Sequence, residues 1–235
     1  MPPPPQQPLP PQLSHVWDVP PMLLPPPKKS RVGLVIGIAG GAFTVVLAIL
    51  VTLVLIEANI GFPEARFTLT LPGTLLDGRY ELTQDLSDSV GRKMEKNSRH
   101  IWDAKITHAV LGRYSLGGAP NRGALLITGI YGRFKNLDET RSEALKRDGE
   151  AAGATVVVSP RDVTPSGADV RISCEVLSRK GPAWTIAYPV CAWADDNTSA
   201  LVAEMVFGAA NADLDLKSAA RTTLQVRSET VKAIK

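Results

Sequence analysis

An uncharged stretch from Val32 to Ile56 constrains this chain more than any other feature. At about 1.5 Å of rise per residue, a helix over its 25 residues is longer than the roughly 30 Å hydrocarbon layer of a bilayer. Its only hydroxyl groups belong to Thr44 and Thr52, so such a helix has no polar face to present to water. We therefore expect a transmembrane helix over residues 32–56.

The charges that flank this stretch predict its orientation. Lys28, Lys29 and Arg31 precede it, whereas Glu57 and Glu64 follow it. Basic residues stay preferentially on the cytoplasmic side, so we expect a single-pass plasma-membrane protein with a cytoplasmic N-terminus and an extracytoplasmic C-terminal domain. The basic residues also resemble the start of a cleavable signal peptide, whose apolar region usually has only about 7 to 15 residues. Retention as an anchor is the favoured interpretation.

Three glycines recur within the predicted span. Gly33, Gly37 and Gly41 lie four residues apart, on one face of a helix. Small residues at this spacing let two transmembrane helices approach closely, which would allow a homodimer. Glycine is common in such helices in any case. Membrane lipid is the partner that the span itself implies.

The segment before the span is rich in proline. Residues 1–31 hold 12 of the 19 prolines of the chain. Proline lacks the amide hydrogen that helices and sheets need, so we expect a disordered cytoplasmic tail. The favoured interpretation is a spacer whose basic end lies on anionic lipid, and the alternative is a ligand for adaptor domains that bind proline-rich peptides.

After a linker over 57–64, residues 65–235 are long enough for one compact extracytoplasmic domain. Their pattern predicts an α+β fold, with an antiparallel sheet and packed helices. The expected elements are a helix with Leu82, Leu86, Val90 and Met94 on one face, strands over 105–116 and 124–134, a helix that is capped by Asn136 or Asp138 and ends at Gly153, a buried strand over 154–158, strands over 168–178 and 183–193, a strand over 199–207, and a helix over 213–234. The pattern SALVAEMV within 199–207 would also suit a helix.

Cys174 and Cys191 are the only cysteines, and both lie in the part assigned to the oxidising side of the membrane. They belong to two expected strands joined by the turn RKGP, so a disulfide bond is the natural interpretation. With the turn centred near Lys180 and Gly181, Cys174 faces Ala187, and a direct bridge then needs a longer loop or a bulge. The alternative is a pair of buried free thiols.

The sequence carries no recognisable catalytic, cofactor or metal-binding motif. The one cluster of suitable side chains is His100, Trp102, Asp103 and His108. Its spacing fits no obvious ligand geometry, and glycine-rich nucleotide motifs and the GxSxG nucleophile motif are absent. The net charge of +3 is too small to imply a nucleic-acid partner. We predict no cofactor and favour a protein that is not an enzyme.

Aromatic and basic residues near the cysteines suggest a partner surface. Trp184 and Trp193 flank the second cysteine strand on opposite faces, so one should be buried and the other exposed. The candidates for the surface are Trp184, Tyr188, Trp193 and Arg122, the last in the loop GGAPNRG. Packing of a tryptophan over the disulfide, and a solvated loop around Arg122, are the alternatives.

A short motif surrounds the second cysteine. Cys191, Trp193 and Asp195 form a CxWxD-like pattern that continues as DNTSALV. Together with the proline-rich tail and the single span, this pattern resembles uncharacterised single-pass membrane proteins of high-GC Gram-positive bacteria. The resemblance implies a place in the bacterial cell envelope and no particular chemistry.

Two functions remain open on these grounds. The absence of catalytic motifs favours a membrane-anchored extracytoplasmic binding or structural module, which contacts another envelope protein or a wall component. The alternative is an envelope hydrolase or lipid-binding carrier whose site is assembled from residues distant in sequence. A pocket of a few hundred cubic ångströms with convergent polar groups would favour the alternative.

Overall fold

The computed structural model describes residues 61–98, 103–181, 184–207 and 214–234. The chain divides into two compact units, 1–58 and 59–235, and the described residues all belong to the second. The predicted tail, span and glycine face lie outside the described residues. Within those residues, no helix combines the length and apolar character that crossing a membrane requires.

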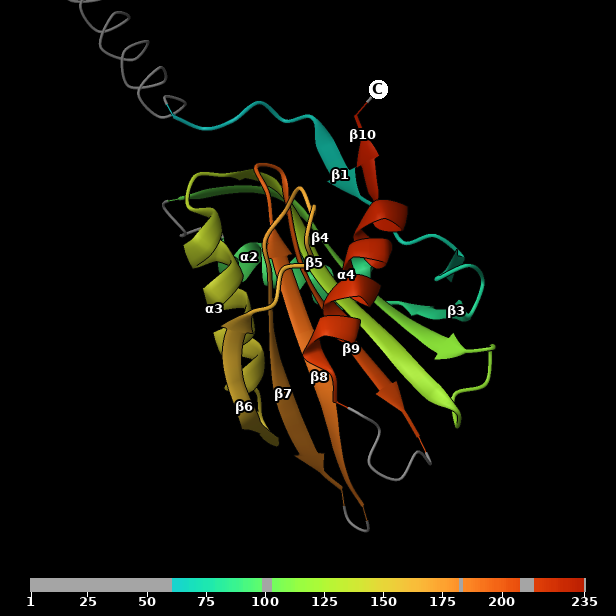
Figure 1. The fold of residues 1–235 in the computed structure, drawn as a ribbon. Coiled ribbons are helices and arrows are strands. Elements are labelled where there is room, and N and C mark those ends of the chain that lie inside the picture. The colour runs from blue at the N-terminus through green and yellow to red at the C-terminus, as the bar shows by residue number, and fades with distance from the viewer. Residues whose placement is uncertain (1–60, 99–102, 182–183, 208–213, 235) are drawn as a thin grey trace, which may run out of the picture. The chain divides into compact units, whose positions relative to one another are not determined.

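In the described part of the chain, an eight-stranded antiparallel sheet forms the body of the domain (Figure 1). Its strand order is β2-β3-β4-β5-β9-β8-β7-β6. The bounds are Thr74–Leu75 for β2, Tyr80–Asp85 for β3, Ala104–Leu116 for β4, Gly123–Phe134 for β5, Ala154–Asp162 for β6, Ile172–Lys180 for β7, Thr185–Ala194 for β8 and Thr198–Val206 for β9. A separate antiparallel pair joins β1, Phe67–Leu69, to β10, Val231–Ala233.

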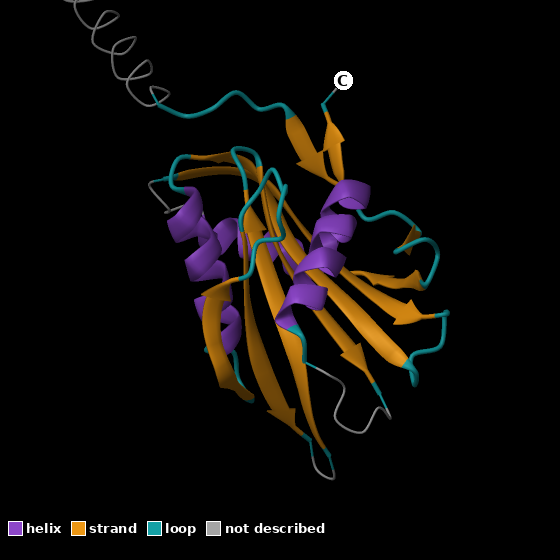
Figure 2. Ribbon diagram, viewed as in Figure 1, coloured by secondary structure: helices purple, strands orange, loops and turns teal. Residues whose placement is uncertain are grey.

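Helices pack on both faces of this sheet, as Figure 2 shows. A π-helical turn, η1 (Ser87–Gly91), leads into α2 (Arg92–Ser98), whereas α3 (Leu137–Gly149) and α4 (Leu216–Thr230) cover opposite faces. Asn136 and Asp215 cap α3 and α4, because their side chains accept backbone N–H groups of the first helical turn. The prediction of an antiparallel sheet with packed helices is confirmed.

The face of the sheet beneath α4 carries the main core. Alternate residues of β7, β8 and β9 point to it, including Cys174, Trp193 and Val202. Leu216, Ala220 and Val226 of α4 complete this core from the other side. The face is closed, since none of the Trp193 surface is exposed and 3% of that of Val202 is.

The predicted disulfide between Cys174 and Cys191 is confirmed, but the predicted register is wrong. The two cysteines are direct cross-strand partners, with their α-carbons 4.0 Å apart. Lys180 pairs with Thr185, so the paired parts of the two strands are separated by more residues than the turn that the sequence suggested. This wider separation sets the register in which the cysteines face each other.

The CxWxD-like motif builds a hydrogen-bonded group that we call the Asp195 network, made of Trp193, Asp195, Thr198 and Arg227. The Trp193 indole donates to the Thr198 hydroxyl at 3.1 Å, and that hydroxyl donates to Asp195 Oδ2 at 2.7 Å. Arg227 of α4 donates to the same oxygen at 2.9 Å. The network therefore ties the β8–β9 turn to the helix over the core.

Asn197, next to this network, holds the segment that leads into the domain. Its amide nitrogen donates to the carbonyl oxygens of Glu64 at 2.8 Å and Gly132 at 3.1 Å. Its amide oxygen accepts the Arg66 N–H at 2.9 Å. The segment DDNT is therefore a structural connection between the N-terminal segment and the end of the sheet.

The helix predicted from the spacing of Leu82, Leu86, Val90 and Met94 is wrong in its first part. Residues 80–85 form β3 instead, and the helical turns begin only at Ser87. The segment then crosses the free edge of β4. Here the Ser87 hydroxyl accepts the N–H of Leu111, and Glu95 accepts that of Ala109. Satisfying these edge groups overrides the local helical pattern.

Two predicted helix ends and the predicted burial of one strand also differ from the structure. Residues 154–158 were expected to be buried, but β6 is an edge strand in which Val156 and Val157 are 43% and 57% exposed. Helix α3 ends at Gly149 rather than Gly153, which lies beyond the helix with a positive φ of 81°. The chain after Thr230 pairs with β1 instead of extending α4.

We expect Asp195→Ala to lower the free energy of unfolding by about 3 kcal/mol, because it removes the acceptor of Thr198 and Arg227 at once. Asp196→Ala is the matched control, since this neighbouring side chain is exposed and its loss should cost under about 0.5 kcal/mol. Denaturant unfolding followed by near-UV circular dichroism measures both. Equal effects of the two substitutions would contradict the role given to the network.

Candidate functional site

The face of the sheet opposite α4 is only partly covered. Helix α3 packs there through Leu145 against Leu177 of β7 and Tyr188 of β8. Leu126 of β5 and Leu201 of β9 border this second core but stay half-buried. A hollow surface is left along β5, β9 and β8, and we call it the trough.

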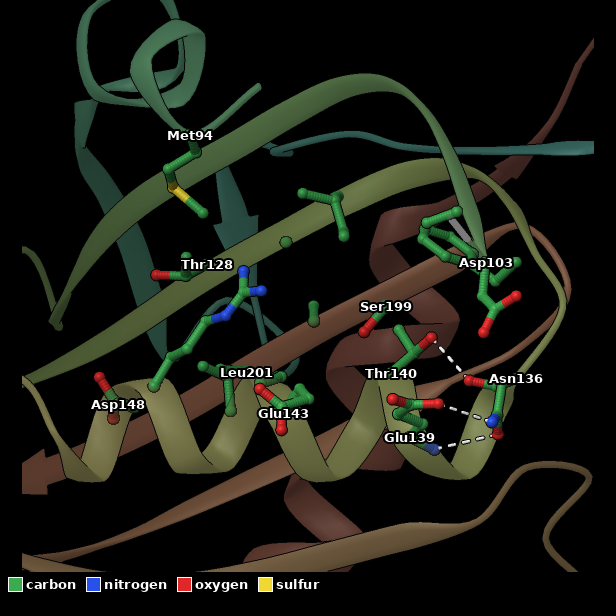
Figure 3. A pocket seen from close by; sticks show the side chains of 17 residues that line it. Met94, Asp103, Thr128, Asn136, Glu139, Thr140, Glu143, Asp148, Ser199 and Leu201 are labelled. Atoms are coloured by element: carbon green, nitrogen blue, oxygen red, sulfur yellow. Dashed lines mark hydrogen bonds between the residues drawn. The ribbon is translucent and has the colours of Figure 1, made fainter. Parts of the chain in front are cut away.

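The upper cavity of the trough lies between α3, α2 and the sheet and has a volume of about 460 Å³. In Figure 3, Thr128 of β5 and Leu201 of β9 lie at the sheet, with Met94 of α2 across from Glu143 of α3. Its polar lining residues are Asp103, Thr128, Asn136, Glu139, Thr140, Glu143, Arg147, Asp148 and Ser199. Its volume lies within the range of small-molecule sites.

Two more cavities continue the trough toward the β7–β8 loop. A middle cavity of about 200 Å³ shares Thr128, Asp148 and Leu201 with the upper one. A lower cavity of about 640 Å³ shares Leu126, Arg179 and Met205 with the middle one. Because neighbouring cavities share lining residues, the three lie next to one another in a row along the strands.

The position of α3 fixes one wall of the trough. Asn136, Thr140, Glu143 and Arg147 recur at helical spacing on the side that lines the upper cavity. On its buried side, Arg141 donates to the Ser173 hydroxyl of β7 at 2.9 Å and to Asp138 at 2.6 Å. Hydrogen bonds from Arg141, and then from Arg171, hold the pKa of Asp138 below its usual value. The helix is therefore anchored on β7, and the wall is formed in advance of any ligand.

The lower cavity is lined mostly by apolar side chains, together with two arginines. Arg113 and Arg179 are its only charged residues within the described lining. Trp184 and Phe207, which also line it, are 56% and 40% exposed. Arg179 Nε donates to the Tyr188 hydroxyl at 2.8 Å, which holds the guanidinium at the junction with the middle cavity.

Two carboxyl groups, those of Glu175 and Asp148, lie at the C-terminal turn of α3. Glu175 of β7 is 1% exposed, and its Oε1 finds no hydrogen-bond partner among the described residues. A Cβ atom added at Gly149 would lie 3.6 Å from the other carboxylate oxygen, Oε2 of Glu175. Burial, and then the charge of Asp148, raise the pKa of Glu175 to about 7. Burial also raises the pKa of Asp148, which lines the upper and middle cavities.

The structure separates the four residues predicted for a partner surface. Trp193 lies in the core beneath α4, with the disulfide in the same core cluster. Tyr188 lies in the second core and is 4% exposed. Trp184 is exposed in the lower cavity, and Arg122 is exposed in the β4–β5 turn. Of the four, Trp184 lines the lower cavity of the trough and Tyr188 the middle one.

Sequence reasoning missed the residues that make the trough. The floor comes from every second residue of β5 and β9, including Leu126, Thr128, Leu201 and Met205. Their alternation within LLITGI and SALVAEMV was a signal that one face of each strand differs from the other. The missing information was that β9 inserts between β5 and β8, which brings these residues together.

The described lining of the three cavities contains no histidine or cysteine. The described residues also contain no group of three or more His, Cys, Asp or Glu side chains arranged to hold a metal ion. His108 contacts Glu95 through Nδ1, away from this lining, whereas His100 and Trp102 lie outside the described residues. The Ser199 hydroxyl donates to the Trp193 carbonyl, and that of Thr140 to Asn136. The hydroxyl groups of these two lining residues are therefore engaged by the backbone.

Comparison with protein families, curated proteins and solved structures finds no match to this chain, so its own geometry carries the functional argument.

The raised pKa of Glu175 predicts a pH-dependent stability. The folded state holds this proton more tightly than the unfolded state, whose value is near 4.5, so stability falls as the pH rises from about 4.5 through 7. We expect Glu175→Gln to remove this pH-dependent part of the free energy of unfolding, which amounts to up to about 3 kcal/mol.

Denaturant unfolding at about pH 5 and about pH 8 measures the effect. Relative to wild type, Glu175→Gln should gain stability at the higher pH. Glu150→Gln, at an exposed carboxyl just after α3, is the matched control and should show no such gain. A constant difference between wild type and Glu175→Gln at both pH values would contradict the assignment.

Proposed function

We propose that this chain is a membrane-anchored, extracytoplasmic binding module of the cell envelope, and that its trough holds the apolar part of an elongated amphiphilic molecule. The observation that carries the proposal is the continuity of three cavities along one face of the sheet. The anchor is supported by the uncharged stretch 32–56. The disulfide is consistent with an oxidising compartment.

The shape of the trough favours a chain-like ligand. Its three cavities follow one another along β5 and β9, so a compact molecule would fill only one of them. The middle cavity has the smallest volume of the three, at about 200 Å³, and Leu126, Leu201 and Ala203 are among its lining residues. A flexible acyl chain can pass such a constriction while burying apolar surface along its length.

The charges along the trough favour a ligand with an anionic group at one end. Arg113 and Arg179 give the lower cavity a positive charge, and guanidinium groups bind carboxylates and phosphates through paired hydrogen bonds. The upper cavity has Glu139, Glu143 and Asp148 against Arg147, which disfavours an anion there. We therefore place the anionic group of the ligand in the lower cavity and its chain toward α3.

This proposal combines the binding module with the lipid-binding carrier that the sequence left as an alternative. The polar and apolar lining of the trough, together with its volume, supports lipid binding. Hydrolysis has no comparable support, because the hydroxyl groups of Thr140 and Ser199 donate to carbonyl oxygens and no described lining residue offers an imidazole base. The resemblance to single-pass envelope proteins agrees with this location.

Binding of fatty acids brominated beside the carboxylate to the intact chain tests the proposal, because that end of the bound ligand would lie near Trp184 in the lower cavity, where bromine quenches the indole fluorescence. We expect saturable quenching by a long-chain acid. Thr128→Phe, which narrows the junction of the upper and middle cavities, should weaken long-chain binding at least about tenfold. Binding of a short-chain acid that fits the lower cavity alone should persist.

Thr155→Phe on the edge strand β6 is the matched control, because Thr155 is exposed and lines none of the three cavities. Trp184→Phe identifies the part of the signal that comes from the lower cavity. The proposal fails if quenching by the long-chain acid does not saturate, or if Thr128→Phe and Thr155→Phe bind it equally well.

A further inference from the structure

Two arginines line the lower cavity from strands that lie well apart in the sheet. Arg113 belongs to β4 and Arg179 to β7, and β5, β9 and β8 lie between these strands. At about 4.8 Å between neighbouring strands, their backbones are roughly 19 Å apart across the sheet. One guanidinium binds both oxygens of a carboxylate through paired hydrogen bonds. The carboxylate of a fatty acid would therefore occupy one arginine and leave the other without an anion.

The two arginines also differ in their position along the trough. Arg179 lines both the middle and the lower cavity, and its Nε donates to the Tyr188 hydroxyl at 2.8 Å. Arg113 lines the lower cavity but neither of the other two. A ligand whose chain passes through the middle cavity therefore meets Arg179 first and Arg113 farther on.

The charge of the lower cavity favours an anion near Arg113. Arg113 is half-buried, and no carboxylate of the described residues lies within ion-pair distance of either arginine. The described lining of this cavity contains no Asp or Glu. A partly buried cation without a counter-ion has lost hydration without compensation, which an anionic ligand group would restore. The same cations disfavour an ammonium group in this cavity.

The volumes of the cavities indicate a ligand with a large polar end and one chain. The lower cavity, at about 640 Å³, is the largest of the three in the trough, and the middle one has about 200 Å³. At roughly 30 Å³ per water molecule, the lower cavity has room for about twenty waters, so a carboxylate alone would leave most of it filled with solvent. The smaller middle cavity favours one acyl chain over two.

We propose that the ligand of the trough is a single-chain glycerophospholipid with an anionic headgroup. Its acyl ester lies at Arg179, and its phosphate pairs with Arg113 on the far side of the lower cavity. This inference rests on the proposed function and adds to it the chemistry of the polar end. Arg113 is then the residue that distinguishes a phospholipid from a free fatty acid.

Quenching of Trp184 in the intact chain tests the inference with two ligands that share one acyl chain. The first is a fatty acid brominated beside its carboxylate, and the second is a lysophosphatidylglycerol brominated beside its ester. We expect the lysophosphatidylglycerol to bind at least about tenfold more tightly, because its phosphate gains charge-assisted hydrogen bonds from Arg113. The corresponding lysophosphatidylcholine should bind more weakly than the lysophosphatidylglycerol, because it carries an ammonium group.

Arg113→Gln should remove the advantage of the lysophosphatidylglycerol and change the affinity for the fatty acid less than about twofold. Unchanged binding of the fatty acid also shows that the variant is folded, and near-UV circular dichroism checks this independently. Arg122→Gln is the matched control, because this exposed arginine of the β4–β5 turn lines none of the three cavities. It should leave both affinities unchanged.

The inference is overturned if the fatty acid binds as tightly as the lysophosphatidylglycerol, or if a folded Arg113→Gln weakens both ligands equally. Displacement of the lysophosphatidylglycerol by an equal concentration of soluble glycerol phosphate would also overturn it, because the site would then bind free phosphate. In each of these cases saturable binding of the fatty acid leaves the proposed function standing. If neither ligand gives saturable quenching, the proposed function fails together with this inference.

Discussion

The hydrogen bonds of Asp195 and its neighbour Asn197 join the β8–β9 turn to the last helix and to the segment where the chain enters the domain. The Asp195 carboxylate accepts from Thr198 at the start of β9 and from Arg227 in the last helix. The adjacent Asn197 binds the backbone at Glu64 and Arg66, where the chain enters. Beside them, the disulfide joins β7 to β8 under α4. These contacts close one face of the sheet completely.

The opposite face is open because its helix is anchored elsewhere. Leu145 and Arg141 fix α3 on β7 and β8, so the neighbouring strands β5 and β9 keep half-buried apolar residues. An eight-stranded sheet is wider than one helix can cover, and the uncovered part becomes the trough. A rigid closed face and a preformed hollow face are thus two results of the same packing.

Local sequence signals predicted the long helices and strands. They failed where contacts between residues distant in sequence determine the local structure. The alternation of apolar residues predicted the hairpin of β4 and β5, and capping chemistry predicted the cap at Asn136. The oxidising compartment predicted the cysteine pairing. The helix expected at Leu82 failed because the free edge of β4 takes up that segment, and the burial of 154–158 failed because β6 is an edge strand. The trough was not predictable from local patterns, since it depends on β9 lying between β5 and β8.

Photochemical crosslinking would locate an acyl chain on the face opposite α4, where we propose that it binds along the strands. A fatty acid with a diazirine near the end of its chain would be bound to the intact protein, irradiated, and located by peptide mass spectrometry. We predict adducts in the upper cavity, at residues such as Ile130, Ala144 and Leu201. Adducts confined to α4 or the edge strand β6, or spread evenly over the surface, would contradict the account.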